Sequence, residues 1–272
     1  MFYASTPAAL KEQIKNCFIH DLGPGKLPKV EEGSLKKMVG LVCPHAGYAY
    51  SGPVAAHAYY NLALDGKPDV VIMFGPNHVG WGSALATMNE GVWTTPLGNV
   101  EIDTSSANEI LHDCSILDVD DSAHVREHSI EVQLPFIQYL YGSSFKFVPI
   151  SFLMQDLDSG REVGRAVAKV LSKKNALMIA STDLTHYEPQ KQALQKDEMV
   201  IDATLKLDEN KLYEIIETYG VSACGYGPVI ALITAAKALG AKEAHLLCHK
   251  TSGDITGDVY SVVGYASISF LR

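Results

Sequence analysis

The amino-acid sequence predicts a single α/β domain over residues 1–272, with a mixed, mostly buried sheet and helices on both faces. Apolar runs of strand length alternate with amphipathic stretches of helix length along the whole chain. There is no internal repeat and no linker-like stretch that would mark a domain boundary. Apolar residues make up 47% of the 272 residues, which is enough to fill one large core.

The expected elements follow the apolar pattern. The first helix is expected to begin after a Ser5 cap, with Pro7 in its first turn, because an apolar face then runs from Leu10 to Phe18. Buried strands are expected where apolar residues run without alternation. In chain order, the later elements are a strand over 38–43, a helix opening near Pro53, a strand over 70–74, short antiparallel strands within 84–102, helices near 105–112 and 129–141, a strand over 145–152, a helix over 159–172, a strand over 176–180, three helical stretches within 190–239, and strands over 245–248 and 259–270.

Composition and absent motifs exclude several functions. The 22 basic and 31 acidic residues give a formal net charge of −9, so no nucleic-acid partner is expected. No apolar run reaches the ~18 residues of a membrane span, and no leader pattern is visible, so the chain is expected to be cytoplasmic. Five cysteines without a CxxC pair favour neither a disulfide framework nor a zinc ribbon. Without a GxGxxG or Walker A pattern, no nucleotide cofactor is expected.

Histidines follow four of the predicted strands. His45, His78, His186 and His249 each come shortly after an apolar run. One histidine at a strand end is usually structural, but ligands of α/β sheets bind beyond the carboxyl ends of the strands, where several histidines would meet. Imidazole is the commonest metal ligand and acid–base group near neutral pH. His45 and His78 with an anionic third ligand would suit Fe(II), Zn(II) or Cu.

Cys224 is a candidate for the third ligand. It precedes a helix that has Pro228 in its first turn, and a helix N-terminus favours the thiolate that binds metals. Free cysteines are also common as small buried apolar residues, and the spacing leaves both interpretations open.

Two further histidines allow alternative interpretations. His124 and His128 are four residues apart and would share a face of a helix, as zinc-binding pairs do. If the helix begins only near His128, that residue alone points into the cleft expected at the carboxyl ends of the strands. This is the favoured alternative. Asp183 precedes His186 by three residues, so its carboxylate either orients that imidazole or caps the helix that follows Glu188.

Five short motifs, in this order, resemble the MEMO family (mediator of ErbB2-driven cell motility). The resemblance covers essentially the whole chain, and the compact length resembles a prokaryotic or archaeal member. The motifs are Pro44-His45-Ala46-Gly47-Tyr48 with Ser51-Gly52, Gly75-Pro76-Asn77-His78, Glu127-His128-Ser129-Ile130-Glu131 with Leu134-Pro135, Ser181-Thr182-Asp183-Leu184-Thr185-His186, and Cys224-Gly225.

The resemblance implies a fold shared with class III non-haem iron extradiol dioxygenases, with a metal at the strand ends. By this similarity His45, His78 and Cys224 form the metal-ligand set. The alignment of the second ligand could be shifted by one residue, from His78 to position 79. The metal is expected to be iron or copper, with zinc less favoured.

The resemblance also implies catalytic residues lining the same pocket. These are His186 in the place of the dioxygenases' acid–base histidine, Asp183, and His128. Because Cys224 takes the place of the dioxygenases' carboxylate ligand, and O₂ chemistry oxidises thiolates, ring cleavage is not expected.

Three functions compete on these grounds. The first is a metal-dependent oxidoreductase acting on an unidentified small molecule. The second is a non-catalytic module that binds a peptide or a small anion in the same pocket. The third, which rests on the resemblance alone, is an accessory factor to a radical-SAM system.

Overall fold

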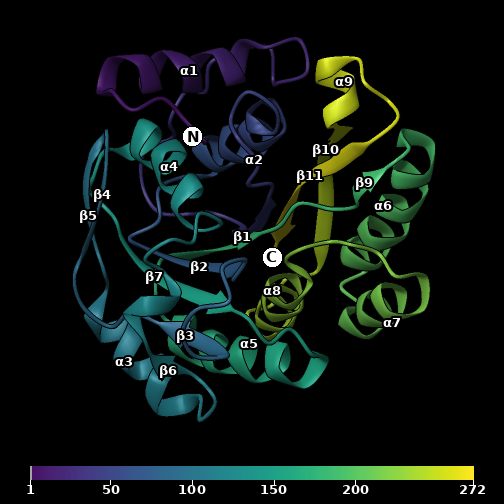
Figure 1. Cartoon of the computed structure of the whole chain (residues 1–272). Coiled ribbons are helices and arrows are strands. Elements are labelled where there is room, and N and C mark those ends of the chain that lie inside the picture. Colours follow the sequence, from purple (N-terminus) through teal and green to yellow (C-terminus); the bar gives the residue numbers. More distant parts are fainter. Residues whose placement is uncertain (1) are drawn as a thin grey trace.

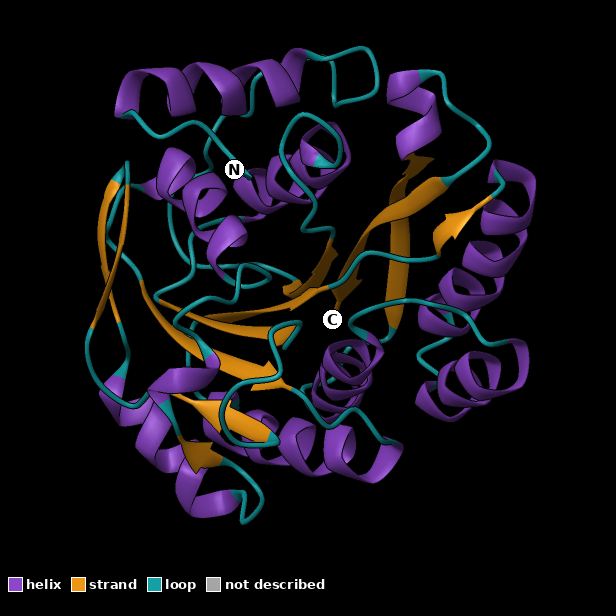
Figure 2. Cartoon of the chain, viewed as in Figure 1, coloured by secondary structure: helices purple, strands orange, loops and turns teal. Residues whose placement is uncertain are grey.

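One mixed sheet runs through the computed structural model, which describes residues 2–272 (Figures 1 and 2). Its strands are β1 (Met38–Cys43), β2 (Val70–Pro76), β3 (Leu85–Thr87), β6 (Asp118–Val119), β7 (Lys146–Phe152), β8 (Ala176–Ser181), β9 (His186–Glu188), β10 (Glu243–Thr251) and β11 (Val262–Leu271). Their order across the sheet is β10-β11-β1-β8-β2-β7-β3-β6, and β9 pairs with β11. β4 (Val92–Thr95) and β5 (Gly98–Glu101) form a separate antiparallel pair.

Helices cover both faces of this sheet (Figure 2). They are α1 (Pro7–Ile19), α2 (Gly52–Asp65), α3 (Thr104–Asp113), α4 (Leu134–Tyr141), α5 (Leu157–Leu171), α6 (Gln190–Leu205), α7 (Glu209–Tyr219), α8 (Tyr226–Ala238) and α9 (Ser252–Thr256). α2 packs on β1, β10 and β11 together with α1 and α4, whereas α8 packs on β1, β2 and β8 and is backed by α5. The predicted fold class, one α/β domain with a mixed sheet between helices, is confirmed.

The central strands are buried along their whole length, as their unbroken apolar sequences predict. Every residue of β1 and β2 is buried; α8 packs on both strands, and α2 packs on β1. Apolar side chains on both faces of parallel strands are typical of such a doubly covered sheet. Within residues 2–272, no helix is both long and apolar enough to cross a membrane.

Two helix starts differ from the sequence-based expectation. Thr6, and not Ser5, caps α1, with its side chain accepting a hydrogen bond from the Ala9 N–H. The helix expected from residue 129 begins as α4 at Leu134, after a 3-10 turn over Glu131–Gln133. The physical reason is that the Ser129 N–H donates to the Glu127 carboxylate instead of joining a helical ladder.

The three central parallel strands end together at one edge of the sheet. β1 and β2 flank β8 on either side, with Cys43 opposite Ser181 and Phe74 opposite Ala180. The segments that follow these strands therefore leave the sheet at the same edge, where α/β proteins bind their ligands. This register brings the candidate residues together.

Candidate metal centre

A cavity of about 710 Å³ opens at this edge of the sheet. All six candidate site residues line it, together with residues from the N-terminal segment, the segment after β1, β9, the segment before α8, and β11. The lining residues are Phe2, His45, Ala46, Gly47, His78, His128, Asp183, His186, Tyr187, Ser222, Cys224 and Val263. The structure thus places the six residues in one pocket, whereas their chemical roles stay predictions.

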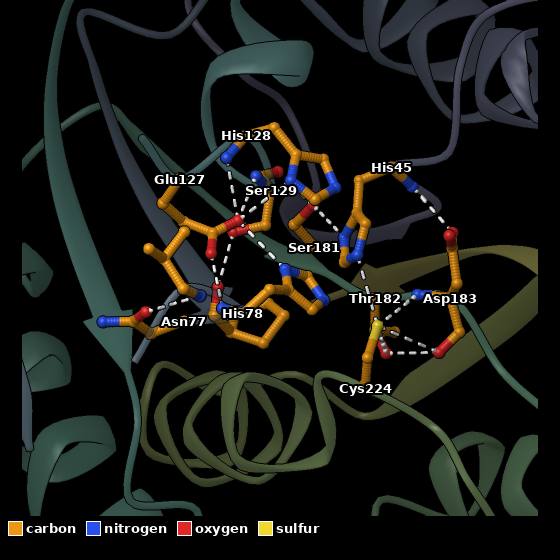
Figure 3. A network of polar contacts seen from close by, with 12 residues as sticks. His45, Asn77, His78, Glu127, His128, Ser129, Ser181, Thr182, Asp183 and Cys224 are labelled. Carbon is orange, nitrogen blue, oxygen red and sulfur yellow. Dashed lines mark hydrogen bonds and ion pairs between the residues drawn. The ribbon is translucent and has the colours of Figure 1, made fainter. Parts of the chain in front are cut away.

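Three imidazoles form the centre of this pocket. His45 follows β1, His78 follows β2, and His128 lies in the segment before α4, yet one ligand atom of each lies within 4.8 Å of the other two. The rings of His78 and His128 stack with centroids 4.9 Å apart, and His45 turns its edge toward both (Figure 3). Such a group of nitrogen donors is suited to a transition metal.

Glu127 contacts the Nδ1 atoms of two of these rings. Its Oε1 lies 3.0 Å from His78 Nδ1 and 3.3 Å from His128 Nδ1, and it also accepts the backbone N–H groups of His128 and Ser129 (Figure 3). Burial raises the pKa of Glu127, but hydrogen bonds from His78 and Ser129 outweigh burial and lower it to about 2. The resulting carboxylate leaves Nε2 of His78 free for the pocket.

His45 is the most deeply buried of the three histidines, at 2% exposure. Burial lowers its pKa well below the usual value, and the neighbouring imidazoles of His78 and His128 lower it further. Its Nδ1 lies 2.9 Å from Ser181 Oγ, and its Nε2 lies 3.2 Å from Cys224 Sγ. A neutral ring of this kind can donate a lone pair to a cation without first losing a proton.

Cys224 meets the triad through His45. It lies just before α8, where Gly225 lets the chain approach β8 so closely that a Cβ there would meet Ser181 O at 2.5 Å. Of the two interpretations of Cys224 that the sequence left open, the electrostatics favour the buried thiol in the absence of a metal. Burial and the neighbouring Asp183 raise the pKa of the Cys224 thiol, although the Asp183 N–H donates to Sγ over 3.2 Å. Without a metal the group is therefore a protonated thiol.

Asp183 and His186 line the pocket but do not form the expected pair. Asp183 Oδ1 accepts the His45 N–H over 2.8 Å, and burial raises the pKa of this carboxyl group to about 6. Nδ1 of His186 lies instead 2.9 Å from the backbone oxygen of Ser222. The alternative of a helix cap is also not realised, because Pro189 occupies the N-cap of α6.

Two other histidines lie outside the pocket. His124 is buried with its ring against Trp93, and burial lowers its pKa to about 4, so it does not join His128 in a metal-binding pair. His249 lies within β10, and its Nε2 is 3.1 Å from Asp197 Oδ2. The expectation that His249 ends a strand at the site is therefore wrong.

Sequence reasoning missed several residues of the site. Phe2 stacks on the His128 ring with centroids 4.0 Å apart, a contact that no local pattern signals. Tyr187, 77% exposed and with a positive φ of 58°, stands beside His186. The position of Glu127 directly before His128 was a usable signal, since carboxylates commonly orient metal-binding imidazoles.

This fold and this pocket define an α/β protein with a histidine-lined candidate metal centre at the carboxyl ends of its central strands. The chain belongs to the Memo-like family, because the family model described as Memo-like protein matches residues 1–269.

Archaeal relatives extend over the whole chain. A MEMO1 family protein of Methanopyrus kandleri is 53% identical over 273 residues, covering 100% of this chain and 96% of that protein. MEMO1 family proteins of Methanothermobacter thermautotrophicus and Sulfolobus acidocaldarius are 48% and 47% identical, covering 98% and 99% of this chain and 96% of each relative.

A solved structure shares the fold at low sequence identity. A crystal structure of an uncharacterized protein from Escherichia coli K12 matches with a TM-score of 0.62 and 14% identity, covering 85% of this chain and 99% of that chain. The likeness supports the α/β architecture alone.

Proposed function

We propose that this protein binds one iron or copper ion in the pocket and is a metal-dependent redox protein. The observation that carries the proposal is the group of His45, His78 and His128, whose ligand atoms lie within 4.8 Å of one another. Imidazole nitrogen suits iron, copper and zinc, and the nearby Cys224 sulfur shifts the preference toward Cu(I) when it ionises.

The residues around the triad fit a cation. The carboxylate of Glu127 stays ionised near neutral pH and adds negative charge behind His78 and His128. The low pKa of His45 keeps that ring uncharged, so His45 does not repel an incoming ion. A bound iron or copper ion would supply one-electron chemistry to this pocket.

The chain's own groups can move protons near this ion. His186 lines the same cavity, and its Nδ1 faces the Ser222 carbonyl, so Nε2 is the nitrogen free to exchange a proton with a ligand. Burial raises the pKa of Asp183 to about 6, so this carboxyl group can also exchange a proton near neutral pH. The cavity volume of about 710 Å³ also leaves room for an organic ligand beside the ion.

Anaerobic titration calorimetry with Fe(II), Cu(I) and Zn(II) tests the proposal. We expect one iron or copper ion to bind per chain, and His78→Ala to weaken binding at least tenfold. His112→Ala is the matched control, since the side chain of His112 is 86% exposed. No heat with any of the three metals would overturn the proposal, and heat with zinc alone would overturn the choice of metal.

A binding module without turnover is the second candidate, favoured by the exposed aromatic rings of Phe2 and Tyr187 beside the cavity. Turnover separates the two candidates. The loaded protein should consume O₂ or a reductant if it is an oxidoreductase. We expect no ring-fission product from catechol, since the donors in the triad are imidazoles with a neighbouring thiol instead of two histidines and a carboxylate.

A further inference from the structure

A buried hydrogen-bond network lies behind His45, on the side away from Cys224. It consists of side chains from α2, β8 and the segment before α4. Its members, each at most 2% exposed, are His45, Tyr59, Ser129, Gln133 and Ser181. Because these groups are buried from water, their donors pair with acceptors of the protein itself.

The amide of Gln133 has one allowed orientation. One end of this amide lies 3.0 Å from the carbonyl oxygen of Pro44, which can only accept, so that end is the NH₂ group. The other end is the oxygen, which accepts the hydroxyl of Tyr59 over 2.6 Å. The NH₂ group therefore also donates to Ser181 Oγ, over 2.7 Å.

The hydroxyl of Ser181 then has one arrangement left. Its single proton is donated to the carbonyl oxygen of Ser129, 2.6 Å away. One of its lone pairs accepts from the Gln133 amide, and the other faces His45 Nδ1 over 2.9 Å. A hydroxyl has one donor and two acceptor sites, and all three are now assigned.

We infer that Ser181 is a positioning residue that fixes His45 in the tautomer protonated at Nδ1 and so presents the Nε2 lone pair to the pocket. If Nε2 carried the proton instead, Nδ1 and Ser181 Oγ would face each other with lone pairs, or Ser129 O would lose its donor. The fixed Nε2 lone pair faces Cys224 Sγ, 3.2 Å away, and accepts a hydrogen bond from the protonated thiol in the metal-free protein.

This arrangement differs from that of His78, whose Nδ1 is held by the carboxylate of Glu127. A neutral hydroxyl fixes the tautomer of His45 without adding a charge beside the ring. One consequence rests on the proposed function: in Ser181→Ala, metal affinity should fall by about 10- to 100-fold. The tautomer itself does not depend on any metal.

Long-range ¹H–¹⁵N NMR of the metal-free protein, with ¹⁵N-labelled histidine, measures the tautomer directly. His45→Ala removes one set of signals and so assigns His45. In the unsubstituted protein at neutral pH we expect a protonated Nδ1 and an unprotonated Nε2. In Ser181→Ala, His45 Nδ1 loses the acceptor that holds its proton, so the population should shift to the form protonated at Nε2.

Ser151→Ala is the matched control. Ser151 lies near the end of β7, is 1% exposed, and its hydroxyl has no hydrogen-bond partner within residues 2–272. The same deletion there should leave the His45 tautomer unchanged. A proton on Nε2 in the unsubstituted protein overturns the inference even if Ser181→Ala does not fold, and so does an unchanged tautomer in folded Ser181→Ala. If the unsubstituted protein has the expected tautomer but binds none of the metals, only the proposed function is contradicted.

Discussion

At the scale of single residues, the histidines of the pocket differ by what holds Nδ1. Nδ1 of His78 and Nδ1 of His128 both face the Glu127 carboxylate, whereas that of His45 faces a hydroxyl and that of His186 a backbone carbonyl. A carboxylate partner makes an imidazole a stronger donor than a neutral partner does. His78 and His128 are therefore the stronger electron donors of the four rings.

Glu127 should contribute to acid stability as well as to the site. Its pKa of about 2 is lower than the value of 4.5 usual for the unfolded chain, so its contribution is complete above pH 4.5 and is lost as pH falls toward 2. Glu127→Gln should cost roughly 2–3 kcal/mol at neutral pH, and the two proteins should converge near pH 2. Urea titrations at pH 7 and pH 3 measure this, and an equal difference at both values would contradict it.

Cys224 should make metal binding dependent on pH. Because its pKa is raised, the thiol is protonated at neutral pH and must release its proton when it binds an ion. We expect affinity to rise about tenfold per pH unit between pH 6 and 8, with one proton released per ion. Calorimetry in buffers of different ionisation enthalpy counts this proton. In Cys224→Ala the release should disappear, and if it persists another group is the source.

At the scale of elements, the buried carboxylate of Asp197 on α6 supports the segment from Asp183 to His186, which lines the pocket. Asp197 Oδ1 accepts the Thr185 N–H over 2.9 Å, and Oδ2 lies 3.1 Å from His249 Nε2 on β10. Gly264 of β11 exchanges backbone hydrogen bonds with Leu184 and Thr185. The segment between Asp183 and His186 is thus fixed by three elements.

Gly264 leaves no room for a side chain at this point. A Cβ there would meet Asp197 Oδ2 at 1.9 Å, so Gly264→Ala must displace the carboxylate or the strand. We expect a loss of about 2–4 kcal/mol in the free energy of unfolding. Asp197→Ala removes the obstructing group, so the double variant should lose less than the sum of the single losses. Strict additivity in chemical denaturation would contradict the proposed clash.

At the scale of the whole molecule, the sequence predicted what depends on strands and their ends. His45, His78, Asp183 and Cys224 were expected at one edge because each follows a strand or precedes a helix, and they do line one cavity. The stacking of Phe2 on His128 joins segments far apart in the chain, so no local pattern contains it. The thiol state of Cys224 depends on burial, which a sequence does not give.

The site also draws its donors from separate parts of the chain, which couples metal binding to folding. His45, His78 and His128 come from three segments that meet only in the native state, so an ion binds the folded protein in preference to the unfolded one. At an ion concentration about 100 times Kd, this linkage stabilises the fold by about 2.7 kcal/mol. For a domain of this size, Tm should rise by roughly 5–10 °C.

Thermal unfolding with and without anaerobic Fe(II) or Cu(I) measures this shift, and a chelator should reverse it. His78→Ala should unfold at a lower temperature in the absence of metal, because buried Glu127 loses its hydrogen bond with His78 Nδ1. The metal-induced shift of each variant is therefore measured against its own metal-free form. His78→Ala should lose most of the shift, since removing one imidazole leaves His45 and His128 without the third donor of the group. His112→Ala should keep the full shift, because the side chain of His112 is 86% exposed and forms no part of the triad. An equal shift in His78→Ala would place the ion elsewhere, since an ion held by this triad cannot stabilise the fold equally well after one of its ligands is removed.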